Sequence, residues 1–303
     1  MTTPSISKQL SLNPLAEAKA KTSAARLSII VAAFLILLKV FTGWYTGSIS
    51  VWASLLDSAM DIFASTLNFF AVRAASRPPD DEHTYGHGKV ESLAGLFQAL
   101  VIALSAAYLI YEAVNRIVEP KPTNSEWFGA IAMLVAAGVS VLLVSKLRRT
   151  ARLTDSPALR SEAAHYASDV YTNIAALFAL VLTAATNWQL ADPIISISLS
   201  VYILWFAVGV GREAADVLMD RRLPTEIDEK VAQVVGRFHG TGVIGFHALR
   251  TRSSGSQKFI EFHLEVERDR KFEEAHEITV NVIRAVEDEI PRSRVQIHTD
   301  PWG

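Results

Sequence analysis

The sequence predicts a membrane-embedded, all-α bundle of six helices followed by a small α+β domain in the cytoplasm. Half of the 303 residues are hydrophobic and the mean hydropathy is +0.25, yet the apolar runs gather in residues 24–218. Residues 219–303 are charged and mixed in polarity, as expected for a soluble domain of about 80 residues. We therefore expect an N-terminal cytoplasmic segment (1–23), a transmembrane domain (24–218) and a cytoplasmic domain (219–303).

Six stretches are long and apolar enough to cross a bilayer, which takes about 20 predominantly apolar residues. They cover residues 27–44, 51–72, 93–114, 127–144, 163–185 and 194–210. Lys and Arg gather before the first stretch and after the second, fourth and sixth, and they are nearly absent from the remaining connections. Because positive charge marks the cytoplasmic side, both termini are expected inside the cell. Helical spans indicate the cell (inner) membrane, since outer-membrane proteins are barrels.

Composition also excludes several classes of protein. The formal net charge of −2 argues against a polyanionic partner, so we expect no nucleic-acid binding. The chain has no cysteine, which excludes disulfides and thiolate metal sites. Residues 1–22 are polar and lack the apolar core of a cleaved signal peptide.

Two of the spans carry pairs of metal-ligand residues that include carboxylates, although a carboxylate inside a bilayer is costly. The second holds Asp57 and Asp61, and the fifth holds His165 and Asp169. Each pair is spaced i, i+4, so its two side chains project from one helix face. If the two helices meet, three carboxylates and one imidazole suit a tetrahedral zinc site, with no basic residue in these two spans to neutralise them. Cadmium, cobalt, manganese and ferrous iron also suit it, and a buried network that only packs the helices is the alternative.

A second cluster of ligand-type residues lies in RPPDDEHTYGHGKVE, directly after the second span. Asp80, His83 and His87 have the spacing of a metal site at the cytoplasmic edge of the membrane. Asp81 or Glu82 are alternative ligands, and a polar loop with two incidental histidines is the competing interpretation.

The C-terminal region predicts the order helix (226–238), strand (243–252), strand (257–267), helix (272–289) and strand (293–299). The evidence is period-two alternation in FIEFHLEVE and a helix start at Pro224. This order fits a small α+β sandwich. We expect one or two zinc ions among four histidines and one acid, while His239 is interpreted as a surface residue. The five residues are His247, His263, His276, His298 and Asp300.

The intramembrane ligand set predicts a metal transporter that uses protons. Carboxylates and imidazole bind protons when empty and lose them when metal binds, so a site exposed to each side in turn exchanges metal for protons. The sequence contains no HExxH, which argues against a zinc hydrolase and hence against an enzyme. It contains no phosphate-binding loop, which argues against an ATP-driven pump. Two competing interpretations stay open, a non-transporting metal sensor and a transporter that works in uptake instead of export.

These motifs together resemble the cation diffusion facilitator family, and are similar to its bacterial zinc and ferrous-iron exporters. The resemblance covers residues 24–301, and its most specific pieces are LLDSAMD, DDEHTYGHGKVES, HYASD, HALRTRSSG, FIEFHLEV and QIHTDP. It implies a transport site, a loop site and a cytoplasmic binuclear site in which Asp300 bridges two metals. Carried onto this chain, these are Asp57, Asp61, His165 and Asp169; Asp80, His83 and His87; and His247, His263, His276, His298 and Asp300.

The resemblance further implies a homodimer with ferredoxin-like cytoplasmic domains in contact, and metal-for-proton antiport by alternating access. It implies a charge interlock between Lys89 and Asp220 at the dimer interface, and no cofactor beyond bound metal. Asp in the first transport position and His in the third resemble the less selective zinc, cadmium and iron type. We therefore expect Zn²⁺ export, with Cd²⁺ and Fe²⁺ as further substrates; an Fe²⁺ or Mn²⁺ exporter of the same family is the alternative.

Overall fold

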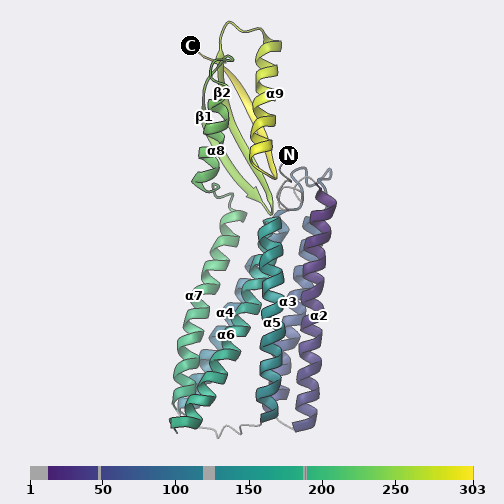
Figure 1. Cartoon of the computed structure of the whole chain (residues 1–303), viewed down its shortest axis with the longest axis vertical. Helices are drawn as coiled ribbons and strands as arrows, with labels where there is room; N and C mark the ends of the chain where they lie inside the picture. Colours follow the sequence, from purple (N-terminus) through teal and green to yellow (C-terminus); the bar gives the residue numbers. More distant parts are fainter. Residues whose placement is uncertain (1–12, 47–48, 119–126, 187, 189, 303) are drawn as a thin grey trace, which may run out of the picture. The chain divides into compact units, whose positions relative to one another are not determined.

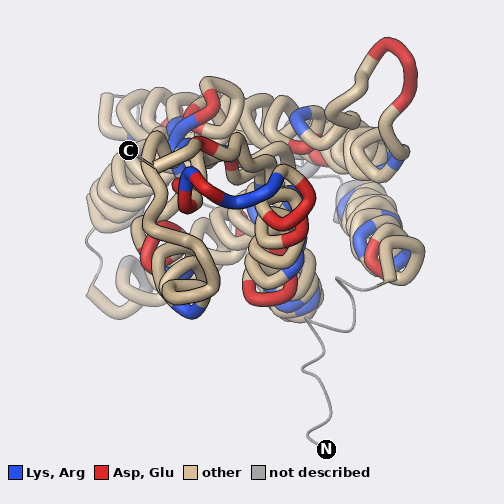
Figure 2. Tube along the Cα trace, turned by 90° about the horizontal axis from the view of Figure 1, so that it is seen from above, with Lys and Arg blue, Asp and Glu red and all other residues tan. Residues whose placement is uncertain are grey.

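The computed structural model describes residues 13–46, 49–118, 127–186, 188 and 190–302. These residues form two compact units, and the boundary between the units falls between Ala215 and Asp216. Acidic and basic residues are interspersed along the trace instead of separating by sign (Figure 2).

The first unit is a bundle of long helices that run side by side (Figure 1). They are α2 (Pro14–Thr46), α3 (Ile49–Ala75), α4 (Lys89–Val118), α5 (Trp127–Thr154), α6 (Pro157–Thr186) and α7 (Ala191–Leu218). Each predicted span lies within one of these helices, in order, so the prediction of six long helices is confirmed. Among the described residues, three segments are long and apolar enough to cross a membrane, and they contain 18-residue stretches with mean hydropathies of 2.3, 2.1 and 2.1. They are Pro14–Phe41, Lys89–Val118 and Pro193–Leu218.

Several helices extend beyond the spans that hydropathy marked, because polar residues do not interrupt a helix where it leaves the bilayer. The start of α2 at Pro14 makes part of the expected N-terminal segment helical, and α6 begins six residues before its predicted span at 163. Apolar side chains of α2, α5 and α6 form one core, with Leu143, Leu147 and Tyr166 almost completely buried.

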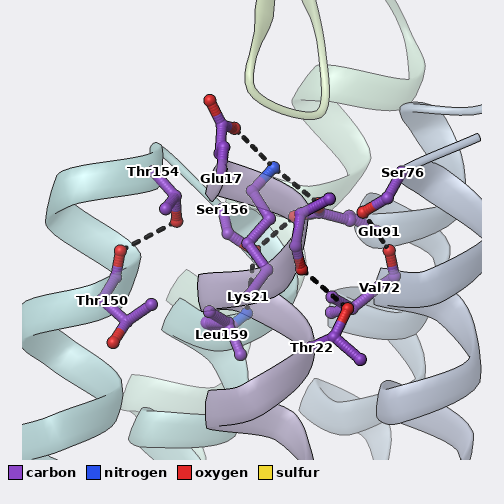
Figure 3. A network of polar contacts seen from close by, with 11 residues as sticks. Glu17, Lys21, Thr22, Val72, Ser76, Glu91, Thr150, Thr154, Ser156 and Leu159 are labelled. Atoms are coloured by element: carbon purple, nitrogen blue, oxygen red, sulfur yellow. Dashed lines mark hydrogen bonds and ion pairs between the residues drawn. The ribbon is translucent and has the colours of Figure 1, made fainter. Parts of the chain in front are cut away.

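A buried polar network joins the same ends of α2, α4 and α6 (Figure 3). Nζ of Lys21 lies 3.0 Å from Glu17 on its own helix and 3.1 Å from Oε1 of Glu91 on α4. The hydroxyl of Ser156, which immediately precedes α6, donates to Oε2 of Glu91. Lys21 is 5% exposed and Glu91 1%, so these charges are sheltered from water. Each oxygen of Glu91 is thus used by a different helix or turn.

The second unit contains a three-stranded sheet with two helices. Its elements are α8 (Thr225–Gly236), β1 (Val243–Ser254), β2 (Gln257–Glu267), α9 (Phe272–Glu289) and β3 (Ser293–Trp302). β2 is central, antiparallel to β1 and parallel to β3, and α9 forms the crossover between β2 and β3. Val234, Ile260 and Val282, from α8, β2 and α9, are completely buried in a common core. The predicted α-β-β-α-β order is confirmed, and β1 and β3 extend past their predicted ends.

Candidate metal-binding sites

Three of the four predicted transport ligands come together where α3 packs against α6. Nε2 of His165 lies 3.1 Å from Oδ1 of Asp61 and 3.9 Å from Oδ2 of Asp169. One ligand atom from each residue lies within 4.8 Å of the other two, which is close enough for one metal ion to bind all three. The side chain of Asp57 lies outside the described residues, although its backbone lies one helix turn before Asp61 on α3.

Burial distinguishes His165 from its two carboxylate neighbours. The imidazole is 3% exposed, whereas the side chains of Asp61 and Asp169 are 28% and 38% exposed. Its Nδ1 is buried without a hydrogen-bond partner among the described residues, so Nε2 is the ring atom directed at the carboxylates. The carboxylates therefore face the accessible side of the site, and the imidazole closes its inner side.

One buried acid at the same helix interface was not predicted from the sequence. Glu162 is 1% exposed, and its carboxylate accepts a hydrogen bond from Nδ2 of Asn68 on α3. The hydroxyls of Ser65 and Tyr166 form a second link between the helices, at 3.0 Å. The sequence feature that could have identified Glu162 is its spacing: it precedes His165 by three residues and therefore shares its helix face. These links hold the ligand-bearing turns of α3 and α6 against each other.

The loop between α3 and α4 brings its three predicted ligands together. Asp80 lies 3.4 Å from Nδ1 of His83 through Oδ1 and 3.2 Å from Nε2 of His87 through Oδ2. Gly86 has a φ of +84°, a left-handed conformation that glycine adopts without strain, and it turns the chain between the two histidines. Ligand atoms of the three residues lie within 4.8 Å of one another.

The electrostatics of the loop favour an ionised Asp80. The backbone N–H of His83 donates to the carboxylate at 2.7 Å, and this bond is the main cause that holds the pKa of Asp80 below its ordinary value. Asp80 is therefore a carboxylate at neutral pH, as a metal ligand must be. The alternative ligands Asp81 and Glu82 are exposed and lie outside the cluster.

Replacing Asp80 with asparagine is expected to weaken zinc binding by the loop more than about tenfold, because both histidines lose their shared carboxylate. The measurement is a zinc titration of the full-length protein, in which the variant is expected to lose one class of binding site relative to wild type. The matched control is Asp81→Asn, which removes an exposed neighbouring charge. Equal effects of the two substitutions would show that the loop attracts metal through net charge alone.

Strand pairing explains how the second unit assembles its histidines. His247 on β1 is paired with His263 on β2, and His263 is paired with His298 on β3. The three imidazoles therefore lie abreast across the sheet, with ring centroids 5.0 Å and 4.8 Å apart. Asp300 lies two residues beyond His298, so its side chain projects from the same face of β3.

The carboxylate of Asp300 is shared by all three imidazoles. Oδ2 lies 2.9 Å from Nδ1 of His263 and 3.5 Å from Nε2 of His247, and Oδ1 lies 3.2 Å from Nε2 of His298. The hydrogen bond from His263 is the main cause that lowers the pKa of Asp300 below its ordinary value. Two oxygens directed at different histidines are the arrangement that a metal-bridging carboxylate needs.

Glu265 is a second acidic residue beside a predicted metal cluster, after Glu162, that was not predicted from the sequence. It is paired with Asp300 across β2 and β3, and its Oε1 lies 3.0 Å from Nδ1 of His247. A carboxylate on one ring nitrogen fixes the tautomer and leaves the other nitrogen free for metal. The signal was the two-residue spacing from His263, which places both side chains on one face of the strand.

The structure does not bring His276 to this cluster within the chain. His276 is exposed on α9 and stacks against Phe272, with ring centroids 6.2 Å apart. His239 is also exposed, in agreement with its interpretation as a surface residue. His276 alone among the five predicted ligands of this region thus stands apart in the described chain.

The two residues of the predicted charge interlock lie in different units. Lys89 is the first residue of α4, and Asp220 follows the end of α7. Oδ1 of Asp220 accepts a hydrogen bond from Nη1 of Arg252 at 3.4 Å, within the second unit. The interlock with Lys89 stays a prediction.

Two family models match nearly the whole chain. The cation efflux transmembrane domain matches residues 25–219, and the cytoplasmic domain of cation efflux proteins matches residues 223–302. The chain belongs to the cation diffusion facilitator family. It is therefore an integral membrane protein and a cation efflux transporter, in agreement with the predicted class and with the expectation of a non-enzyme.

Relatives within the family cover the same extent. The chain is 41% identical over 278 residues to the cation-efflux pump FieF of Citrobacter koseri, and the match covers 92% of each protein. The same identity and coverage hold for FieF of Escherichia fergusonii. A solved structure of CzrB in its zinc form is 35% identical and covers 27% of this chain and 92% of that one. Its TM-score of 0.25 is too low to support an inference about this chain.

Proposed function

We propose that this family member exports Zn²⁺ from the cytoplasm in exchange for protons, with Cd²⁺ and Fe²⁺ as further substrates. The observation that carries the proposal is the convergence of Asp61, His165 and Asp169 from two facing helices, within 4.8 Å of one another. Asp57, one turn before Asp61, is the proposed fourth ligand. Three carboxylates and one imidazole complete a tetrahedral set for zinc.

The chemistry of this ligand set couples metal to protons. An empty site with this much negative charge inside a bundle attracts protons, and a divalent cation displaces them when it binds. Exposure of the site to the cytoplasm and then to the opposite side would export one metal ion and return protons. In this scheme the proton gradient supplies the driving force. The protein alternates between a state in which the site is open to the cytoplasm and a state in which it is open to the opposite side.

The remaining assignments follow the division of the chain. Residues 24–218 are proposed to be the transport domain, and residues 219–303 a cytoplasmic metal-binding domain that joins two copies into a homodimer. The loop cluster around Asp80 and the sheet cluster around Asp300 are proposed as further metal sites. Both termini are proposed to be cytoplasmic, because Lys and Arg are concentrated in the segments on that side.

The test is zinc flux into sealed vesicles that contain the purified protein, with and without an imposed pH gradient. Wild type is expected to follow the gradient, and Asp61→Ala is expected to fall to the background of empty vesicles. Asp81→Ala, which changes an exposed acid outside the clusters, should transport like wild type. Flux that ignores the gradient would indicate a channel or facilitator, and metal binding without flux would indicate a sensor.

A further inference from the structure

Lys39 places a positive charge inside the helical bundle. It lies in the segment Pro14–Phe41 of α2, which contains an 18-residue stretch of mean hydropathy 2.3. A charged side chain at this depth normally faces the interior of a bundle and finds polar partners there. Nζ of Lys39 donates a 2.6 Å hydrogen bond to Oγ of Ser58 on α3, and Ser58 is 3% exposed. The ammonium group therefore points toward α3 and away from lipid.

The position of Ser58 brings this charge to the transport site. Ser58 directly follows Asp57 and precedes Asp61 by three residues on α3. Residues spaced i, i+3 are neighbours on a helix surface, about 5–6 Å apart at Cβ. Asp61 in turn contacts His165 at 3.1 Å. The ammonium group is therefore held about one helix turn from the proposed ligands, on the side formed by α2.

We propose that Lys39 is a resident counter-cation of the transport site. Its positive charge compensates the carboxylates while no metal is bound. When a divalent cation binds to these carboxylates, the ammonium group remains nearby and repels it. In a sheltered bundle, charges one helix turn apart interact far more strongly than they do in water. Lys39 therefore lowers the affinity of the site for metal and speeds metal release. This inference rests on the proposed role of Asp61 and its neighbours in binding the transported ion.

The experiment measures Cd²⁺ and Zn²⁺ binding to the full-length protein for three substitutions of Lys39. Lys39→Met and Lys39→Gln remove the charge, and each is expected to tighten binding at the Asp61-dependent site about tenfold or more. Lys39→Gln retains a hydrogen-bond donor for Ser58, so it separates charge from bonding. Lys39→Arg keeps the charge and is expected to bind like wild type. At saturating metal, the two uncharged variants are expected to transport more slowly.

Each protein is also measured with Asp61→Ala, so that the loop and cytoplasmic clusters are subtracted as a common background. If Asp61→Ala leaves wild-type binding unchanged, the proposed transport site itself is wrong. If Asp61-dependent binding exists but Lys39→Gln does not tighten it, the counter-cation role is wrong. The same holds if Lys39→Arg behaves like Lys39→Met, because affinity would then follow side-chain shape and not charge.

Discussion

Glu91→Gln is expected to lower the stability of the transmembrane unit by about 3 kcal/mol, because it removes the carboxylate that compensates a buried ammonium. Lys21 is 5% exposed, and Glu91 is 1% exposed and used by both Lys21 and Ser156. Glu17 still contacts Lys21, but it lies on the same helix and cannot replace the link from α2 to α4. The measurement is the thermal unfolding midpoint of the protein in detergent.

The chain offers a matched control on the same helix. Glu112 pairs with Arg116 on α4 at 3.2 Å, and both side chains are well exposed. Exposed pairs contribute about 0–1 kcal/mol, so Glu112→Gln should leave the midpoint nearly unchanged. The triple variant Glu17→Gln/Lys21→Met/Glu91→Leu removes every charge of the network, the buried Glu17 included, and should recover most of the loss. If Glu91→Gln and Glu112→Gln were equivalent, the buried network would have no special role in stability.

Asp300→Ala is expected to weaken zinc binding at the sheet cluster by more than about 100-fold, because three imidazoles lose the carboxylate between them. Its oxygens lie 2.9, 3.5 and 3.2 Å from ring nitrogens of His263, His247 and His298, so one truncation removes all three contacts. The measurement is a zinc titration of the full-length protein that resolves the site lost. Asp288→Ala, which changes an exposed acid on α9, is the control for net charge.

A substitution of the neighbouring Glu265 is expected to cause a smaller loss of zinc affinity than Asp300→Ala. Its contact with His247 orients the ring without replacing Asp300, so Glu265→Gln should cost about 10–100-fold in affinity. The expected order of affinity is wild type, then Glu265→Gln, then Asp300→Ala. An Asp300→Ala variant that still binds zinc at wild-type affinity would rule out a bridging role for this carboxylate.

Patterns along the chain were enough to predict the helices, the strands and the residues that share a face. Hydropathy over about 20 residues marks a span, and alternation marks a strand, because both depend only on neighbours along the chain. The i, i+4 spacing of His165 and Asp169 and the i, i+2 spacing of His298 and Asp300 likewise fix which side chains project together. Spacing alone groups residues within one helix or strand, whereas the joining of the two helix pairs into one site was predicted from their ligand chemistry and from the family resemblance.

Contacts between distant segments that belong to no predicted ligand set are visible only in three dimensions. Helix spacing cannot reveal that Lys39 of α2 reaches Ser58, or that Lys21 reaches Glu91 across 70 positions. The two ligand-bearing spans contain no Lys or Arg of their own, so the charge beside them had to come from a third helix. Glu265 depends equally on strand register, which sets its pairing with Asp300. The physical reason is that packing joins segments distant in sequence, while local patterns show only the faces available for it.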